Sequence, residues 1–417
     1  MGTQHHHFSQ PNSHFLTKKL IAWALYALIP LGLLHYYLFP LSRTQTPQPP
    51  EITISSQVPH QTGNLPRCDY SNGEWIQDSS GPRYNGTSCK TIKDGQNCMA
   101  HGRPDTDYLY WRWRPKQCEL PPFDPVSFLS QTRNKHLAFV GDSMARNQLE
   151  SLLCLLATSS IPELVYHDEE NKFRRWVFKD YNATVSVFWS PFLVQGKEKK
   201  AELGLNHNML YLDSPDERWA SELDQIDIVV FSIGHWFLHP AVYYEKDVAL
   251  GCHHCPELNH TEIGFFDVFR KAIETTLKEV SRRDDSKFAA VVTFSPAHFE
   301  GEWDKAGACP KKEPYREGEK EMEYMDKEMR KMEVEEVAAA AKNAKGVRIE
   351  ALDVTKLALL RADGHPGPYM YPNPFAGGVK DRVQNDCVHW CLPGPIDTWN
   401  EILLEMIKRW KNEQRSN

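Results

Sequence analysis

Two groups of polar residues have the side chains that nucleophilic catalysis requires. Ser143 ends a Gly-Asp-Ser run that follows an apolar stretch at 136–140 and precedes a stretch with helical spacing. Near the C-terminus, Asp386 and His389 stand three residues apart. A serine hydroxyl becomes an effective nucleophile when a neutral imidazole takes its proton, and a carboxylate holds that ring in one tautomer. Ser143, Asp386 and His389 are therefore a candidate catalytic triad.

Both groups also have a purely structural interpretation. Asp142 and Ser143 are residue types preferred as helix N-caps, so their run could simply begin a helix. The aspartate and histidine near the C-terminus could lie in a surface loop held by neighbouring cysteines. His365, two residues after Asp363, is a rival base, although its Gly and Pro neighbours indicate a structural turn. The triad hypothesis requires the two groups to meet in the fold.

The chain must therefore be divided into elements that could bring these residues together. Apolar runs that alternate with amphipathic stretches predict an α/β fold, with a parallel sheet covered by helices. Ser143 would lie at the carboxyl end of a strand, where open α/β sheets place their sites, and at the start of a helix, whose dipole favours an oxyanion. The expected strands are residues 136–140, 184–189, 226–232, 288–294 and 347–352. The expected helices include residues 149–156, 266–280, 317–341 and 396–410. The helix at 317–341 has methionines at three- and four-residue intervals, and we expect this stripe to pack on its own domain.

The N-terminal region has the composition of a membrane anchor. Residues 20–41 form an apolar run long enough to span a bilayer, and no small-residue cleavage site follows it. Lys18 and Lys19 precede the run and only Arg43 follows closely, which favours a cytoplasmic N-terminus and a lumenal remainder. The expected organisation is a cytoplasmic tail at 1–19, the anchor at 20–41, a Pro/Ser/Thr-rich stem at 42–66, a Cys-rich segment at 67–132 and a catalytic domain at 133–417.

The charge balance argues against nucleic-acid binding, and the expected lumenal location decides how the cysteines are interpreted. The chain has 48 Lys and Arg against 55 Asp and Glu, a net charge of -7, whereas nucleic-acid binding calls for a basic face. The ten cysteines are an even number, and an oxidising lumen would pair them. Cys252 and Cys255 flank two histidines, yet we expect them to pair with each other, and we assign no metal. Sequons for N-glycosylation begin at Asn85, Asn182 and Asn259.

Longer motifs surround both groups of candidate residues. The run Gly-Asp-Ser-Met-Ala-Arg-Asn-Gln at 141–148, with Asp-Cys-Val-His-Trp-Cys-Leu-Pro-Gly at 386–394, closely resembles the plant trichome-birefringence-like family of polysaccharide O-acetyltransferases. The resemblance extends from Cys68 to the C-terminus. It includes Gly-Arg-Pro-Asp at 102–105, Tyr-Leu-Tyr-Trp-Arg-Trp-Arg-Pro at 108–115, Ser-Pro-Ala-His-Phe at 295–299 and Asp-Gly-His-Pro-Gly at 363–367.

The resemblance implies a GDSL/SGNH-like fold with a disulfide-stapled N-terminal segment packed on it, the triad Ser143, Asp386 and His389, and acetyl transfer to a cell-wall glycan. It also implies a type II membrane protein of the Golgi. Residues 233–240 and 368–375 look like those of members that act on xyloglucan. The disulfides that we expect are Cys68–Cys118, Cys89–Cys154, Cys98–Cys391, Cys309–Cys387 and Cys252–Cys255.

Residues near the expected site are candidates for two further roles. Many relatives carry Asn where this chain has Ser232, so Ser232, Gly234 and Asn147 are all candidate oxyanion donors. Trp236 and Trp390 are candidates to stack on sugar rings.

The expected reaction is a double displacement through an acetyl-serine. No bound cofactor is expected, but an acetyl donor is required, and the sequence does not identify it. The same triad would serve a carbohydrate acetylesterase, in which water is the acceptor, and a glycan-binding protein without turnover would explain the aromatic residues alone.

Overall fold

The computed structural model describes residues 68–200, 204–283, 287–378 and 381–416. The tail, the anchor and the stem expected at 1–66 lie outside the described residues. Within the described ranges, no helix has both the length and the apolar character needed to cross a membrane. Residues 66–417 form one compact unit, so the Cys-rich segment packs on the catalytic domain as expected.

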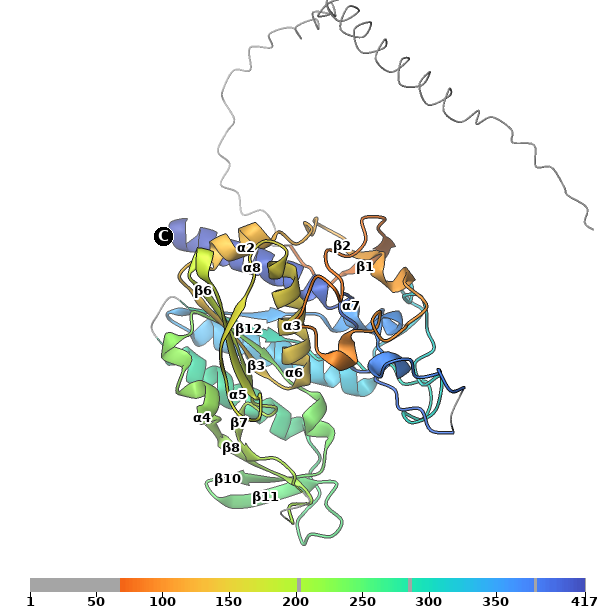
Figure 1. The fold of residues 1–417 in the computed structure, drawn as a ribbon. Helices are drawn as coiled ribbons and strands as arrows, with labels where there is room; N and C mark the ends of the chain where they lie inside the picture. The colour runs from red at the N-terminus through yellow and green to blue at the C-terminus, as the bar shows by residue number, and fades with distance from the viewer. Residues whose placement is uncertain (1–67, 201–203, 284–286, 379–380, 417) are drawn as a thin grey trace, which may run out of the picture. The chain divides into compact units, whose positions relative to one another are not determined.

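A mostly parallel sheet lies at the centre of this unit, in the strand order β13-β12-β9-β3-β6-β5-β4 (Figure 1). The strands predicted from the sequence are its parallel members, and the α/β fold is confirmed. They are β3 (His136–Gly141), β6 (Ala183–Trp189), β9 (Ile228–Ser232), β12 (Lys287–Val292) and β13 (Val347–Leu352). The antiparallel edge that the sequence did not indicate consists of β5 (Phe173–Phe178) and β4 (Glu163–His167).

Helices cover both faces of the sheet, and β3 shows why its sequence is apolar throughout. Leu137 and Phe139 point into one core, shared with α3 and α8, while Ala138 and Val140 point into the other, shared with α5 and α6. A strand buried on both faces reads as a continuous apolar run because neither face meets water. The helices on the first face are α2 (Pro125–Gln131), α3 (Ser143–Ala157) and α8 (Asp397–Ser416); those on the second are α5 (Phe266–Ser281) and α6 (Tyr324–Asn343).

The methionine-striped helix is shorter than predicted at its N-terminal end. Helix α6 begins at Tyr324, because Glu323 and Asp326 form a capping box that fixes the first turn there. Met329 and Met332 are buried in the second core, so the stripe packs on its own domain as expected. The last helix, α8, starts where predicted and extends further, to Ser416.

A second, smaller sheet was not predicted. Its order is β11-β10-β8-β7, and β8 packs against α5 (Figure 1). Its strands mix polar and apolar residues, and two of them contain glycine, so their sequences lack the continuous apolar runs of the central sheet. They are β7 (Val194–Lys197), β8 (Asn208–Pro215), β10 (Ala241–Glu245) and β11 (Val248–His253), and the short helices α4 (Glu217–Ala220) and α7 (Thr355–Leu359) complete the domain.

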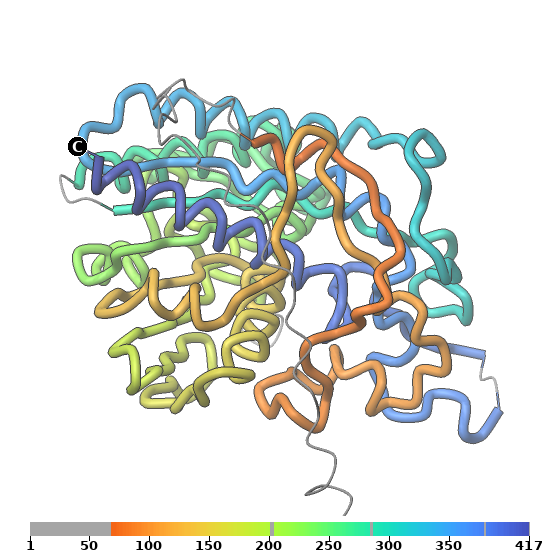
Figure 2. Tube along the Cα trace, turned by 90° about the horizontal axis from the view of Figure 1, so that it is seen from above, coloured from red at the N-terminus to blue at the C-terminus, as the bar shows by residue number. Residues whose placement is uncertain are grey.

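The Cys-rich segment forms the antiparallel pair β1 (Gly73–Gln77) and β2 (Trp111–Pro115), linked by long loops. Trp75 and Trp113 meet edge to face across this pair, and the Trp75 indole N–H donates to the carbonyl of Leu357 in α7. Figure 2 shows the segment running beside the C-terminal part of the chain. The disulfides are the five pairs that we expected: Cys68–Cys118, Cys89–Cys154, Cys98–Cys391, Cys309–Cys387 and Cys252–Cys255.

Candidate active site

Ser143 is the first residue of α3, immediately after the carboxyl end of β3. Asp142 is the N-cap, and its Oδ1 accepts a hydrogen bond of 2.8 Å from the N–H of Met144. Gly141 has a φ of 154°, and a Cβ there would lie 1.8 Å from the carbonyl oxygen of Ser232. Only glycine therefore allows β3 and β9 to approach at this point. The result is a half-buried serine at the positive end of a helix.

Asp386 and His389 form the hydrogen-bonded pair that the triad requires. His389 Nδ1 lies 2.7 Å from Asp386 Oδ2. The other oxygen, Asp386 Oδ1, accepts from the N–H groups of Val388 and His389, at 3.0 and 2.9 Å. The carboxylate is thus fixed by its own turn, and the histidine is held with Nδ1–H toward it and Nε2 free for proton transfer.

The two members of this pair have pKa values shifted in opposite directions. Burial raises the pKa of Asp386, but the charge of His389 and hydrogen bonds from His389 and Val388 outweigh it, so the net shift is downward. Burial lowers the pKa of His389, but the charge of Asp386 and its hydrogen bond outweigh that effect, and the net shift is upward. Asp386 is therefore ionised wherever His389 titrates.

The nucleophile helix and the histidine loop are joined by Asn147, one turn after Ser143. Asn147 Nδ2 donates to the carbonyl of Trp390 at 3.2 Å, and Asn147 Oδ1 accepts from the N–H of Trp390 at 2.7 Å. His389 Nε2 is buried and has no hydrogen-bond partner among the described residues. Catalytic hydrogen bonds are often long without substrate and tighten in the reacting complex. The clamp holds the loop that carries His389 against α3, whose first residue is Ser143.

A second buried carboxyl, that of Asp142, interacts electrostatically with the same imidazole. Burial raises the pKa of Asp142 to about 6. The backbone N–H groups of Met144 and Gly234 and the charge of His389 lower this pKa, but burial outweighs them. The Asp142 charge in turn contributes to the raised pKa of His389. The N-cap residue therefore acts electrostatically on the base as well as starting the helix.

The carbonyl of His389 is held by a pair of buried histidines. His365 Nδ1 lies 2.7 Å from that oxygen. His365 Nε2 lies 2.7 Å from His298 Nδ1, and His298 Nε2 lies 2.8 Å from the carbonyl oxygen of Leu359. Each of the three contacts needs a hydrogen, because carbonyl oxygens only accept, but two neutral imidazoles carry only two. Burial lowers the pKa of both histidines, so the two rings are neutral near pH 7 and one of the three contacts lacks a hydrogen. His365 also stacks on the Trp390 ring, with the ring centroids 4.2 Å apart.

The remaining family-like motifs converge on the same loop. Arg103 donates to the carbonyls of His365 and Asp363, at 2.8 and 2.7 Å. The N–H of Leu392 donates to the carbonyl of Gln96 at 2.8 Å, next to the Cys98–Cys391 disulfide. The Cys-rich segment thus supports the loop that carries His389.

Three sequence-based expectations change once these contacts are known. Trp390 is 0% exposed, so its ring does not form a wall for a glycan. Asn147 uses its side chain on the Trp390 backbone and is a positioning residue in this structure. His365 is not a rival base, because both of its ring nitrogens are engaged and Asp363 pairs instead with Arg361, at 2.8 Å.

The other candidates lie close to the nucleophile. Ser232 ends β9, and its carbonyl accepts from the N–H of Asp142 at 3.1 Å. Gly234 follows it, next to the turn His235–Leu238 that carries Trp236. Trp236 is half-buried, and its ring meets Trp189 edge to face at 5.2 Å. Ser232 and Gly234 thus remain candidate oxyanion donors, and Trp236 remains a candidate wall.

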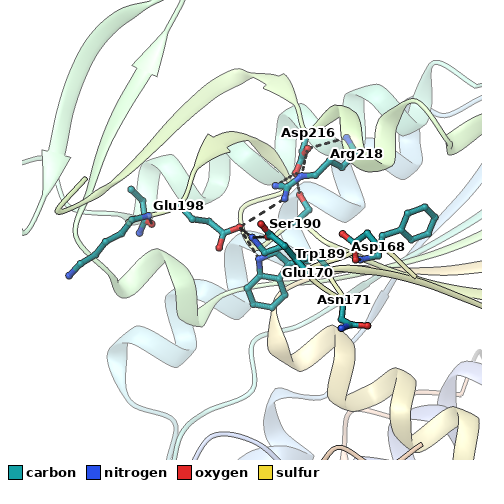
Figure 3. Close-up of polar contacts among 12 residues, drawn as sticks. Asp168, Glu170, Asn171, Trp189, Ser190, Glu198, Asp216 and Arg218 are labelled. Carbon is teal, nitrogen blue, oxygen red and sulfur yellow. Dashed lines mark hydrogen bonds and ion pairs between the residues drawn. The ribbon is translucent and has the colours of Figure 1, made fainter. Parts of the chain in front are cut away.

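Sequence reasoning missed a polar network beside Trp236. The Trp189 indole N–H donates to Glu198 at 3.0 Å, and Lys172 also contacts Glu198, at 3.2 Å. Figure 3 shows this network with the adjacent Asp216–Arg218 ion pair. The guanidinium of Arg146, one turn after Ser143, lies 4.2 Å above the Trp189 ring. The sequence did offer one indication of this network, because Arg146 belongs to the motif at 141–148 that contains Ser143.

Exposure and disulfide bonding bear on the other predicted sites. Asn85, Asn182 and Asn259 are exposed, which N-glycosylation requires. Cys252, Cys255 and Glu262 have atoms close enough to hold a metal ion, but the two sulfur atoms form a disulfide and are not thiolate ligands.

Two family models and several relatives match this chain over most of its length. Residues 120–406 match the PC-Esterase family, described as a GDSL/SGNH-like acyl-esterase family found in Pmr5 and Cas1p, and residues 66–119 match the PMR5 N terminal Domain. Xyloglucan O-acetyltransferase 1 of Populus trichocarpa is 62% identical over 96% of each chain. Xyloglucan O-acetyltransferase 1 of Arabidopsis thaliana is 60% identical over 83% of this chain and 82% of the relative. Protein trichome birefringence-like 25 of Arabidopsis thaliana is 44% identical over 84% of this chain and 78% of the relative. The chain that places Ser143 at the start of α3 and His389 on the loop clamped to it belongs to the PC-esterase family of GDSL/SGNH-like acyl esterases.

Proposed function

We propose that the protein is an O-acetyltransferase that transfers acetyl groups to hydroxyls of xyloglucan. The observation that carries the proposal is the identity of 60–62% with proteins named xyloglucan O-acetyltransferases, over most of the chain. The Asp386–His389 pair beside the start of α3 supplies the chemistry that this transfer needs.

The residues support a two-step reaction. His389 Nε2 takes the proton of Ser143 as the hydroxyl oxygen attacks the acetyl carbonyl, and the donor's leaving group receives that proton. His389 then deprotonates a glycan hydroxyl, which attacks the acetyl-serine and regenerates Ser143. Asp386 stabilises the imidazolium formed in each step. The positive end of α3, with Ser232 or Gly234 as further donors, would stabilise the oxyanion.

The donor and the acceptor must both reach Ser143. The acetyl donor is a second substrate of this reaction, and its leaving group must be better than the glycan hydroxyl. Trp236 is the aromatic residue that we assign to the acceptor side, because it is half-buried and follows Gly234 closely. Water must be kept from the acetyl-serine, since hydrolysis would make the enzyme an acetylesterase.

We further propose that the protein is a single-pass type II membrane protein of the Golgi with a lumenal catalytic domain. Disulfides persist in oxidising compartments, and all ten cysteines are paired. The exposed sequons and the apolar run at 20–41 support the same topology. Protease protection of glycosylated protein in sealed vesicles would test it; digestion of the catalytic domain without detergent would contradict it.

The function is tested by incubating the protein with an activated acetyl donor and separate xyloglucan, xylan and mannan oligosaccharides. We expect acetylated xyloglucan, and an acetylated peptide containing Ser143 when the acceptor is omitted. Ser143→Ala should lose both products. Ser159→Ala, at an exposed serine just after α3, is the matched control and should keep them.

Two results would contradict the proposal in different ways. Release of free acetate with no acetylated glycan would show an acetylesterase. Equal or greater transfer to xylan or mannan would refute xyloglucan as the acceptor while leaving the acetyltransferase activity in place.

A further inference from the structure

Three exposed aromatic residues lie beside the segment that leads into the catalytic loop. Among the residues that the structure describes, six Phe, Tyr or Trp side chains are exposed. Three of these are Phe299, Trp303 and Tyr371, at 42%, 52% and 47%. Phe299 ends the motif at 295–299, and Tyr371 lies in the family-like stretch at 368–375. Single exposed apolar residues are common, whereas several on one part of a surface mark a binding site.

Trp303 is attached to the residues that precede Asp386. The N–H of Asn385 donates to the carbonyl of Trp303 at 2.8 Å, and the N–H of Val383 donates to the carbonyl of Asp304 at 2.9 Å. The side chain of Asn385 also donates to the Trp303 carbonyl, at 3.3 Å. Asn385 is one residue before Asp386, about 3.3 Å along an extended chain. The backbone of Trp303 is therefore held close to the triad.

Tyr371 lies on the opposite side of this segment. Its hydroxyl donates to Gln384 Oε1 at 2.7 Å. The N–H of Asp386 donates to the carbonyl of Gly367 at 3.0 Å, in a bridge between the two backbones. Asp386 and the residue before it thus bond to different stretches of the chain, so the stretches that carry Trp303 and Tyr371 flank the segment from two sides.

The third ring, Phe299, lies on a stretch that links Trp236 to the catalytic loop. The turn that carries Trp236 is bonded to the start of this stretch, through a histidine ring that donates to the carbonyl of Ser295 at 2.9 Å. Further along, the N–H of His298 donates to the carbonyl of Cys387 at 2.9 Å, and Phe299 comes next. Exposed aromatic rings therefore continue from the turn of the candidate wall Trp236 to the residues around the triad carboxylate.

The charges around these rings are nearly balanced. Residues 299–316 contain four acidic and four basic side chains, and residues 368–385 contain one acidic and two basic ones. Arg382 pairs with Asp304 between the two stretches, at 2.8 Å. Both views show the two stretches on the same side of the unit (Figures 1 and 2). Exposed aromatic rings among balanced charges suit an uncharged pyranose, whose apolar face can stack and whose hydroxyls can bond to polar side chains.

We propose that Phe299, Trp303 and Tyr371 form an aromatic platform that binds pyranose rings of the polysaccharide acceptor, next to the unit whose hydroxyl is acetylated. The identity of that polysaccharide rests on the proposed function. Binding to the platform does not require turnover, so the two can be tested separately.

Trp303→Ala is the sharpest variant, because it removes the ring and leaves the backbone carbonyl that accepts from Asn385. The full-length proteins are titrated by calorimetry with xyloglucan, xylan and mannan polymers, without acetyl donor. We expect the parent to bind xyloglucan, Trp303→Ala and Phe299→Ala to weaken this binding several-fold, and Trp303→Phe to recover most of it. The matched control is Tyr166→Ala, since Tyr166 is 47% exposed on the edge strand β4, and it should leave binding unchanged.

Kinetics separate a binding role from a structural one. Trp303→Ala should raise the apparent KM for the polymer with little change in kcat, and should leave the rate of Ser143 acetylation by the donor unchanged. A structural role, acting through Asp386, would slow that acetylation instead. Tyr371→Phe keeps its ring and loses only the hydrogen bond to Gln384, so it should bind the polymer like the parent, whereas Tyr371→Ala should bind it more weakly.

Equal polymer affinity for Trp303→Ala, Phe299→Ala and the parent would overturn the platform, and so would a parent that binds none of the three polymers. Weakened binding in these variants, with no acetyl transfer by the parent, would support the platform and refute the acetyltransferase function. Binding of xylan or mannan in place of xyloglucan, weakened by the same variants, would support the platform and refute only the proposed acceptor.

Discussion

At the scale of single residues, two buried carboxyls act on one imidazole from different positions. Asp386 is ionised and hydrogen-bonded to His389, and its pKa is lowered by that contact. Asp142 caps α3 and has its pKa raised to about 6 by burial. Both raise the pKa of His389, Asp386 through its charge and a hydrogen bond, and Asp142 through its charge alone.

The first prediction concerns the pH dependence of acetylation. His389 must be neutral to accept a proton, and its pKa is raised above 6.5, so the rate should fall as the pH decreases through a midpoint above 6.5. Asp142→Asn keeps a good N-cap but removes a negative charge, so the midpoint should move to lower pH. Stopped-flow measurement of Ser143 acetylation across pH would show this shift, and an unmoved midpoint would refute the electrostatic role of Asp142.

The same substitution predicts a change in stability. A carboxyl whose folded pKa is raised from 3.8 to about 6 binds its proton more tightly in the folded state, so its ionisation destabilises the fold as pH rises from about 4 to 6. Removing it should increase the free energy of unfolding at pH 7 by up to about 3 kcal/mol, and by little at pH 3. Denaturant unfolding at both pH values gives the comparison; equal gains would point to a cause other than ionisation.

The second residue-scale prediction concerns the neutral pair of His298 and His365. The charged groups around the pair include Asp363, Glu300 and Lys320, besides the triad itself, and burial lowers the pKa of both rings. Raising the pH above neutral should therefore not alter the contact of His365 with the carbonyl of His389. His298→Gln, which can still donate to Leu359 but removes the imidazole beside His365, should lower kcat at neutral pH.

The control for the histidine pair is His136→Gln, a buried histidine at the start of β3 that bonds to Ser186. It should keep the parent's kcat. Imidazole nitrogen NMR gives an independent readout, because neutral and protonated rings differ in chemical shift; a protonated ring in the pair at neutral pH would refute this assignment.

At the scale of elements, catalysis depends on how α3 is fixed to the loop at 386–394. Asn147 makes both hydrogen bonds of this clamp, to the backbone of Trp390. The loop has no regular structure of its own in most of its length, so its position comes from such contacts. A small shift of a catalytic group is enough to reduce the rate strongly.

Asn147→Ala should therefore lower kcat by tenfold or more with little change in acceptor KM. It should also reduce stability by about 1–3 kcal/mol, because backbone groups of Trp390 lose their partners. Asn400→Ala is the matched control, since Asn400 links α8 to α3 through Gln148 and Ser151 without touching the loop. We expect Asn400→Ala to lose similar stability and keep kcat. Equal losses of kcat in both variants would contradict a specific role of the clamp in positioning His389.

At the scale of the whole molecule, the Cys-rich segment holds the elements that carry the catalytic residues in place. The Cys98–Cys391 disulfide and the contacts of Arg103 tie it to the loop that carries His389. The Cys89–Cys154 disulfide ties it to α3, which carries Ser143. Both sides of the triad are thus linked to one segment.

Replacing Cys98 and Cys391 together by serine should cost about 2–5 kcal/mol of stability and lower kcat. The control replaces Cys252 and Cys255, which form a disulfide between positions three apart and are far from the triad in sequence. That variant should keep kcat. Thermal unfolding and acetyl transfer measured on both variants would separate the effects, and unchanged kcat after loss of Cys98–Cys391 would contradict the supporting role.

The sequence by itself determined the features whose physical cause is local. Parallel strands buried on both faces must be apolar along their length, so β3, β6, β9, β12 and β13 were visible as runs. The Asp386–His389 pair was visible because a carboxylate and an imidazole three positions apart in one turn can reach each other. The triad could be named from these local features and from the resemblance of its motifs.

Only the tertiary structure decided the groups that tune and position this triad. His298, His365 and Asn147 come from separate parts of the chain, and no local pattern shows that their polar atoms meet at the backbone of His389 and Trp390. Trp390 is buried and so does not line a glycan-binding surface, because the exposure of a ring depends on what packs over it and not on its neighbours in sequence. The second sheet stayed hidden for the same reason: strands of mixed polar and apolar residues are stabilised by the partners they pair with, and pairing is a property of the fold.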